Sequence, residues 1–257
     1  MTISNTQQGY VTSIIENNIA TIEFFHPQGN SLPGNLLDEL ANAVISAGVN
    51  NTARVIVLRS AGVKAFCAGA SFNELAAIDT ETTGTTFFNG FAKVINAMRA
   101  TPKLVIARVQ GKCVGGGVGL AAAADYAIAT RGADIKLSEL EIGIGPFVIG
   151  PAVERKIGIA AFSQLSINAA NWYSAGWAEQ KGLYAEVHET IEMTDAAVKK
   201  LSQRLAGYNP QAMAELKAML WQGTEHWDEL LHERATISGR LALSEFAKQA
   251  IAAFGRK

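Results

Sequence analysis

Apolar and polar positions follow two different periods in the first two thirds of the chain. Residues 19–25 read Ile-Ala-Thr-Ile-Glu-Phe-Phe, which is close to the two-residue period of a strand, and residues 16–18, Glu-Asn-Asn, are typical of a turn. Residues 55–58, Val-Ile-Val-Leu, contain no polar position and predict a strand that is buried on both faces. The expected extended segments are 11–15, 19–25, 55–58, 104–109, 126–130 and 135–137.

Helical spacing of apolar residues separates these strands and dominates the last third of the chain. The segment after Pro33, a residue that can begin a helix, and the segment 81–98 both carry this spacing. Further helices are expected at 158–168, 174–181, 195–206, 210–222 and from 244 onward. Strands that alternate with helices, followed by helices alone, predict an α/β fold with a core over 1–194 and a helical C-terminal region over 195–257.

Composition and charge restrict the classes of partner. The chain has 257 residues, 49% of them hydrophobic, with 22 basic and 23 acidic residues and a formal net charge of −1. This balance disfavours nucleic acid and anionic membranes as partners. The polar N-terminus and the lack of an apolar run of about 18 residues disfavour export and membrane insertion, so we expect a cytoplasmic protein. Cys67 and Cys113 form no disulfide or zinc pattern and are expected to be reduced thiols.

Two glycine-bearing turns at predicted strand ends are candidate ligand-binding elements. One is Phe-Cys-Ala-Gly-Ala at 66–70, and the other is Gly-Gly-Gly at 115–117, where a helix is expected to begin. Glycines permit close approach of the backbone and leave N–H groups free to point at a ligand. Two such groups that converge on one oxygen would form an oxyanion hole, which stabilises charge on a thioester carbonyl. A plain tight turn is the alternative for either segment.

The residue pattern disfavours three other kinds of site. Residues 117–122 satisfy the G-x-G-x-x-A dinucleotide fingerprint, and Glu139 follows at a suitable distance. That fingerprint should follow its strand immediately, whereas several residues separate Val109 from Gly117, so a dinucleotide site is disfavoured. No histidine lies near Ser138 to suggest a nucleophilic triad. No metal site is expected, because ligand spacing is absent among the histidines, at positions 26, 188, 226 and 232.

Glu139 and Glu141 are the candidate acid–base residues. They precede the apolar residues Ile142, Ile144 and Phe147, whose contact would remove water from a carboxyl group, raise its pKa and suit it to proton transfer. A solvated surface glutamate or a helix-capping acid is the alternative for each. If this segment is extended, both side chains share a face, and if it is a turn, they diverge.

Four segments together resemble the enoyl-CoA hydratase/isomerase (crotonase) family. They are FCAGA at 66–70, QGKCVGGGVGLAAAADYAIAT at 110–130, LSELEIGIGPF at 137–147 and YSAGWAEQKGLYAEV at 173–187, and the similarity extends from about Ile14 to the C-terminus. The resemblance implies a crotonase-like spiral of ββα units with a helical C-terminal trimerisation region, in which two trimers often pair. It also implies an acyl-CoA thioester as substrate, with coenzyme A as part of that substrate and no further cofactor.

The resemblance implies roles for individual residues as well. The oxyanion-hole donors would be the backbone N–H groups of Ala70 and Gly116, with Glu139 as the acid–base residue and Asp125 as a structural acid. In the family, a C-terminal Phe and Lys close over coenzyme A. The residues expected to bind the substrate are Ala68, Gly69, Gly115, Gly119, Phe147, Phe254 and Lys257.

Gly119 stands where the family's hydratases carry a second glutamate. Hydration needs a water held between two carboxylates, and a glycine leaves an open space there, whereas shifting a double bond needs one base. We therefore expect an enoyl-CoA isomerase with Glu139 as its only base, and the Gly-Pro-Phe at 145–147 resembles the family's single-glutamate isomerases. The alternatives are a hydratase of a branched or dicarboxylic enoyl-CoA, with Glu141 or a substrate group as second acid, an acyl-CoA decarboxylase, and a non-catalytic acyl-CoA binder.

Some positions depart from the family pattern or leave two interpretations open. Gln28 and Gly29 occupy the loop where a basic residue often meets the coenzyme A phosphates, so Lys64 or Arg108 is a candidate for that contact. Ser71 stands where the family often has an aspartate. The C-terminal region carries apolar residues that fit either a subunit interface or the cover of their own core, namely Trp221, Trp227, Leu230 and Leu231.

Overall fold

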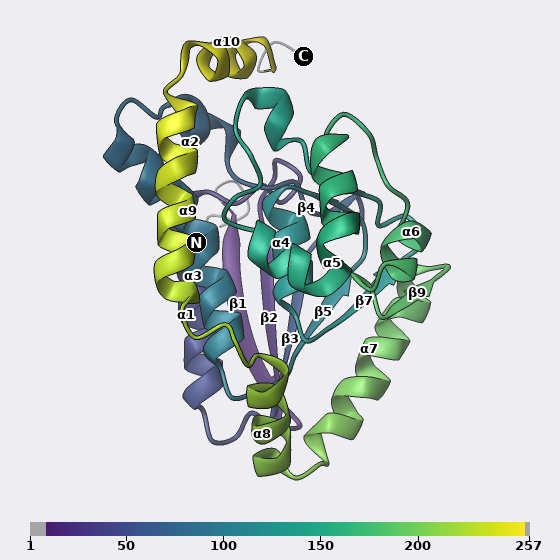
Figure 1. Cartoon of the computed structure of the whole chain (residues 1–257). Coiled ribbons are helices and arrows are strands. Elements are labelled where there is room, and N and C mark those ends of the chain that lie inside the picture. The colour runs from purple at the N-terminus through teal and green to yellow at the C-terminus, as the bar shows by residue number, and fades with distance from the viewer. Residues whose placement is uncertain (1–8, 255–257) are drawn as a thin grey trace, which may run out of the picture.

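The computed structural model describes residues 9–254 and contains two β-sheets (Figure 1). The larger sheet has the order β1-β2-β3-β5-β7-β9 and is parallel except for the antiparallel β1–β2 pair. Its strands are β1 (Tyr10–Glu16), β2 (Ile19–Phe25), β3 (Val55–Ser60), β5 (Val105–Val109), β7 (Tyr126–Thr130) and β9 (Glu186–His188). The smaller sheet consists of three parallel strands, β4 (Ala65–Cys67), β6 (Lys112–Val114) and β8 (Ile135–Lys136).

Helices cover the larger sheet on both faces, which explains the continuous apolar run of β3. Val55 and Val57 belong to a cluster that includes Val198 of helix α7 (Ile191–Ala206). Ile56 and Leu58 point the other way and belong to the main core, together with residues of α1 (Gly34–Val49) and α3 (Glu81–Ala100). A strand in this position needs apolar side chains on both faces.

The remaining helices lie around the smaller sheet and in the C-terminal region. They are α2 (Phe72–Ala76), α4 (Gly116–Ala123), α5 (Gly150–Ile167), α6 (Ala175–Gln180), α8 (Pro210–Leu220), α9 (Trp227–Ala242) and α10 (Glu245–Phe254), with one 3₁₀ helix, η2 (Glu139–Ile142). After β9 the described chain is helical, and Figure 1 shows α9 running beside α3 while α10 crosses the top of the molecule near α2. The predicted α/β fold class is confirmed, whereas the division at residue 195 remains a prediction.

Most of the predicted elements are confirmed, and the differences have local causes. β6 and β9 are absent from the predicted elements because three residues are too few for a two-residue period to be recognised. α9 is also absent, since several of its buried positions are small residues among charged ones. α5 begins at Gly150 rather than at residue 158, because Gly158 with φ 74° makes a kink inside the helix that resembles a helix start.

The acid predicted to be structural, Asp125, joins α8 to the junction of β5 and β7. Its carboxylate accepts hydrogen bonds from the Val105 N–H at 2.7 Å and the Trp221 Nε1–H at 2.7 Å, and it lies 3.0 Å from the Lys217 ammonium. Lys217 is 2% exposed and also donates to the carbonyl oxygens of Met98 and Lys103. A buried charge pair with its remaining donors satisfied is costly to break, so α8 is firmly attached to the core.

The C-terminal aromatic residues serve their own chain. Trp221 and Trp227 pack edge to face at 5.8 Å, and Leu231 is completely buried in the main core. Of the two interpretations of these residues, the structure therefore favours the cover of their own core. α9 also crosses α3 at a pair of glycines, where a Cβ on Gly84 would lie 2.7 Å from the Cα of Gly239.

Both cysteines are buried free thiols that face the centre of the smaller sheet. Cys67 of β4 and Cys113 of β6 are register neighbours, and the Tyr184 hydroxyl donates to the Cys113 sulfur at 3.5 Å. Burial raises the pKa of the Cys67 thiol to about 12 and raises that of Cys113 as well. Neither is a reactive thiolate near neutral pH.

Candidate functional site

The three strands of the smaller sheet bring the predicted site segments together at one edge. Because β4, β6 and β8 are parallel, their carboxyl ends lie side by side. The turn at 68–70 follows β4, the glycines at 115–117 follow β6, and Glu139 comes shortly after β8. Segments that are distant in the sequence thus meet through the pairing of three short strands.

A cavity of about 630 Å³ opens at this edge. Six of its wall residues are aromatic, and several come from α2 and α3, which cover the turns. Phe87, Phe88 and Phe91 of α3 supply three of these aromatic side chains, and the sequence pattern assigns them no role. Among the predicted site residues, those that line the cavity are Ala68, Gly69, Ala70, Gly115, Gly116, Glu139 and Phe147.

The turn at 68–70 is held in place so that one N–H group remains free. The Leu32 N–H donates to the Gly69 carbonyl at 2.8 Å, and the Ser71 N–H donates to the Leu32 carbonyl at 3.0 Å. Gly69 has a φ of 92°, which only glycine adopts readily. Among the residues that the structure describes, the Ala70 N–H has no hydrogen-bond acceptor, and it lies on the cavity wall.

The second turn presents the Gly116 N–H, the first of helix α4, close to the first turn. Gly115 reaches a φ of 52°, and Gly116 N lies 3.8 Å from the position that a Cβ on Gly69 would occupy. Within residues 9–254 the Gly116 N–H likewise lacks an acceptor, as expected at a helix start. The two turns are therefore near enough for both N–H groups to approach one oxygen, and the ring of Phe91 packs against Gly116.

Glu139 lies directly beside these turns. A Cβ on Gly115 would be 2.8 Å from Glu139 Oε1, which places the carboxyl group next to the second turn. The Oε2 atom is buried and has no hydrogen-bond partner in the described part of the chain. Desolvation raises the pKa of Glu139 from 4.5 to about 7, although a hydrogen bond from its own backbone N–H opposes the shift. A buried acid with a free lone pair at a cavity wall is suited to proton transfer.

Glu141, the other candidate acid, points elsewhere. Residues 139–142 form the 3₁₀ helix η2, which ends at Gly143 with a φ of 76°, so the two glutamates diverge as expected for a turn. Glu141 is exposed, does not line the cavity, and pairs with Lys136 at 2.7 Å. The structure thus brings one carboxyl group, rather than two, into the cavity.

The space beside Gly119 is filled, which corrects the expectation that this glycine leaves an opening. A Cβ on Gly119 would lie 2.5 Å from Cγ2 and 2.7 Å from Cβ of Ile149, the residue that precedes α5. Ile149 lines the cavity, whereas Gly119 is buried behind it. Gly119 is therefore not a cavity-wall residue, contrary to its assignment from the sequence.

The candidate phosphate contacts are not at the cavity. Arg108 is buried, forms a two-pronged ion pair with Asp195 of α7 at 2.6 and 3.0 Å, and packs at the larger sheet. Lys64 is exposed and does not line the cavity, whereas Gln28 does. Phe254 is the last residue of α10, and Lys257 lies outside the described residues.

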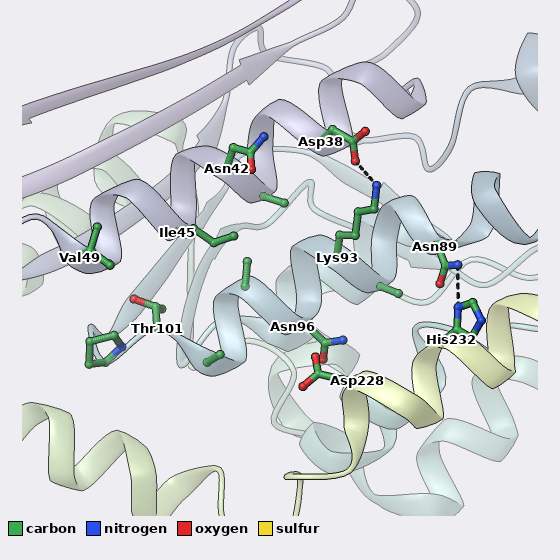
Figure 2. Close-up of a pocket in the computed structure, with 16 residues that line it drawn as sticks. Asp38, Asn42, Ile45, Val49, Asn89, Lys93, Asn96, Thr101, Asp228 and His232 are labelled. Carbon is green, nitrogen blue, oxygen red and sulfur yellow. Dashed lines mark hydrogen bonds and ion pairs between the residues drawn. The ribbon is translucent and has the colours of Figure 1, made fainter.

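A larger depression of about 880 Å³ lies between α1, α3 and the start of α9, away from the predicted site residues (Figure 2). Its charged and polar side chains largely satisfy one another. Lys93 pairs with Asp38 at 2.6 Å, and Asn89 hydrogen-bonds the His232 ring at 3.0 Å (Figure 2). It lacks a buried unpaired group of the kind that Glu139 supplies, so the smaller cavity is the better candidate site.

The raised pKa of Glu139 predicts a pH-dependent cost to stability. An acid whose pKa is 4.5 when unfolded and about 7 when folded loses stability as the pH rises between these values. The loss is ~3 kcal/mol above pH 7 and absent below pH 4.5. Relative to the native protein, Glu139→Gln should gain that amount of unfolding free energy between pH 5 and pH 8, measured by urea denaturation. A stability difference that does not change with pH would contradict this expectation.

In the described range, no group of three or more His, Cys, Asp or Glu side chains is arranged to hold a metal ion. Among residues 9–254, none of the helices has both the length and the hydropathy that a membrane crossing requires.

Enzymes from other organisms are similar to this chain in sequence. Mitochondrial methylglutaconyl-CoA hydratase from Rattus norvegicus is 34% identical over 200 residues, which cover 76% of this chain but only 63% of that protein. A peroxisomal Delta(3,5)-Delta(2,4)-dienoyl-CoA isomerase from Arabidopsis thaliana is 26% identical over 240 residues, which cover 87% of this chain and 84% of that one. These relatives include both hydratases and an isomerase.

Solved structures and a family model identify the fold and the family. The crystal structure of an enoyl-CoA hydratase from Bacillus halodurans matches with a TM-score of 0.87 and 22% identity, covering 95% of this chain and 99% of that chain. That similarity shows the crotonase fold. The model of the enoyl-CoA hydratase/isomerase family matches residues 14–254. The chain therefore belongs to the enoyl-CoA hydratase/isomerase family.

Proposed function

We propose that this protein is an acyl-CoA enzyme that shifts the double bond of a 3-enoyl-CoA thioester, with Glu139 as its only base. The observation that carries the proposal is a single carboxyl group, with one buried oxygen that has no partner, beside two turns with free N–H groups. Membership of the enoyl-CoA hydratase/isomerase family supports an enoyl-CoA as the substrate class. The lack of a second carboxyl group at the cavity favours isomerisation over hydration.

The reaction divides into two proton transfers. The ionised Glu139 carboxylate takes a proton from C2 of the substrate, and the electrons of the broken C–H bond move onto the thioester oxygen. The N–H groups of Ala70 and Gly116 hydrogen-bond this oxygen and stabilise the dienolate. Glu139 then returns the proton to C4, which leaves the double bond between C2 and C3 and regenerates the carboxylate.

The apolar cavity wall suits both the binding of an acyl chain and the stabilisation of the oxyanion. Phenylalanine side chains of α2 and α3 offer an apolar surface for an acyl chain, and Phe91 covers Gly116. Helix α10 packs its Ala247 and Ile251 against Leu75 of α2 and so closes one side of the site. An apolar surrounding strengthens hydrogen bonds to the developing oxyanion.

A panel of thioesters tests the proposal. The protein is incubated with a 3-enoyl-CoA, crotonyl-CoA and a 3-hydroxyacyl-CoA, and the products are identified by mass and by NMR. We expect the 3-enoyl-CoA to change without a change in mass, and crotonyl-CoA to gain no water. Rapid hydration of crotonyl-CoA, or loss of carbon dioxide from a glutaconyl-type thioester, would replace isomerisation as the function.

Hydration of a carboxylated enoyl-CoA is the second candidate. It is favoured by the similarity to the rat methylglutaconyl-CoA hydratase, although the chain spans less than two thirds of that protein. Lys136 lies in the cavity wall and could meet a substrate carboxylate if its pair with Glu141 opened. Adding 3-methylglutaconyl-CoA to the panel decides this candidate, because its hydration adds the mass of one water.

The pH dependence of turnover should follow the ionisation of Glu139. With a pKa of about 7 in the free protein, the carboxylate form is a minority below neutral pH. We expect kcat/KM for a 3-enoyl-CoA to rise with pH, reach half its plateau near pH 7, and fall to about a tenth at pH 6. Steady-state kinetics between pH 5.5 and 8.5 measure this, and a flat profile would exclude Glu139 as the base.

We further propose, from the family resemblance, that the chain forms a trimer or a pair of trimers and that the C-terminal end of α10 helps to cover coenzyme A. Light scattering coupled to size exclusion gives the number of copies directly. Three or six copies are expected, and a monomer would contradict the proposed assembly.

A further inference from the structure

The proposed mechanism leaves one part of the cavity wall unexplained, which is formed by Ile149 with Gly119 buried behind it. Gly119 lies in α4, three residues after the Gly116 donor, so both positions occupy the same side of that helix. The Cγ2 atom of Ile149 occupies the space that a side chain on Gly119 would need, at 2.5 Å from the Cβ position. Ile149 is 4% exposed and faces the cavity.

We propose that Ile149 is a specificity-determining residue that excludes water from the acyl group by filling the place of a second acid. This inference rests on the proposed isomerase function and names the residue that separates isomerisation from hydration. The position is occupied by hydrocarbon, since Ile149 belongs to the same apolar core cluster as Val118 and Leu120 of α4 and Ala152 and Val153 of α5.

The chemical consequence concerns the 2-enoyl thioester that isomerisation produces, because its C3 is the carbon to which water can add. A water that adds to C3 must be held by two or more polar partners, and one of these must remove its proton. The Ile149 side chain supplies neither, so a water beside it would lack partners. The 2-enoyl product is therefore released without the addition of water, and the acyl group leaves with the same atoms that it brought.

The distances between Gly119 and Ile149 determine which substitutions make room for a second acid at position 119. Ile149→Ala would keep the Cβ that lies 2.7 Å from the Gly119 Cβ position, so alanine does not make enough room. Ile149→Gly leaves the Cα as the nearest atom of that residue, at an ordinary 3.7 Å. Glycine is also acceptable at a position that precedes a helix. The informative variant is therefore the double substitution Gly119→Glu with Ile149→Gly.

The first experiment measures hydration of crotonyl-CoA by mass, beside isomerisation of a 3-enoyl-CoA. We expect the double variant to hydrate crotonyl-CoA at least about tenfold faster than the native protein, because only it has both the space and the second carboxyl group. Gly119→Glu alone keeps the clash, and Ile149→Gly alone lacks the acid, so neither should gain hydration. A matched control, Gly132→Glu with Ile167→Gly, changes two exposed positions away from the cavity and should behave as the native protein.

The inference is overturned if the double variant folds, binds crotonyl-CoA and hydrates it no faster than the native protein. A native protein that leaves the 3-enoyl-CoA unchanged would instead contradict the proposed function, so the two failures are distinguishable.

A second measurement does not depend on the double variant. In D₂O, Ile149→Gly should incorporate more deuterium at C4 of the isomerised product than the native protein, since removal of this side chain makes room for solvent in the cavity that Glu139 also lines. Equal incorporation in both proteins would also overturn the inference.

Discussion

Replacing Glu139 by glutamine should lower the turnover of a 3-enoyl-CoA by about 10²-fold or more, the usual effect of losing a general base. Glutamine keeps the size and polarity of the side chain but cannot accept the C2 proton. The N–H groups of Ala70 and Gly116 are untouched, so binding of the thioester should persist. Steady-state kinetics and a direct binding measurement with the same thioester separate these two effects.

Glu141→Gln is the matched control for this experiment. It makes the same chemical change two residues away, in a side chain that pairs with Lys136 and does not line the cavity. We expect Glu141→Gln to retain turnover close to that of the native protein. Equal losses in both variants would mean that the pair of glutamates acts together, and full activity of Glu139→Gln would remove Glu139 from the mechanism.

A methyl group on Gly117 is expected to have the second largest effect. Its Cβ would lie 2.3 Å from the carbonyl oxygen and 2.9 Å from the Cβ of Cys67, and the backbone of β4 cannot move aside easily. Gly117→Ala must therefore push the two site turns apart. If one N–H group loses contact with the thioester oxygen, kcat should fall by about 10²- to 10³-fold.

Gly132→Ala is the control for the glycine substitution, because no heavy atom lies within 4 Å of the new methyl group. The measurements are kcat for a 3-enoyl-CoA and the thermal unfolding midpoint of both variants. Gly132→Ala should match the native protein in both, whereas Gly117→Ala should unfold at a lower temperature and lose turnover. A Gly117→Ala protein with native kcat would show that the separation of the turns is not critical.

Local patterns in the sequence predict much of the fold and the main acid. Both faces of the apolar segment 55–58 can be buried only if the strand lies between two layers. The structure places this strand between α7 and the main core. The glycines at 69 and 115 mark backbone conformations that other residues avoid, and both lie on the cavity wall. Glu139 is identifiable because the apolar residues that follow it, Ile142, Ile144 and Phe147, line the same cavity and Glu139 is desolvated there.

Contacts between distant segments explain what the sequence does not predict. Gly119 and Ile149 meet where α4 packs on α5, and neither residue carries a local sign of this contact. Arg108 looks like a free cation in the sequence, yet its partner Asp195 comes from a helix far along the chain. A charge in a buried strand is more often paired within the protein than available to a ligand.

The contact between α3 and α9 is expected to affect which acyl chains fit the cavity. The two helices touch at Gly84 and Gly239, where a Cβ on Gly239 would lie 2.6 Å from the Thr85 nitrogen. The neighbouring Ser238 of α9 belongs to the cavity wall. A larger residue at the contact would increase the distance between the helix axes and move that wall outward. Chain-length preference is therefore expected to depend on backbone spacing that no substrate atom touches.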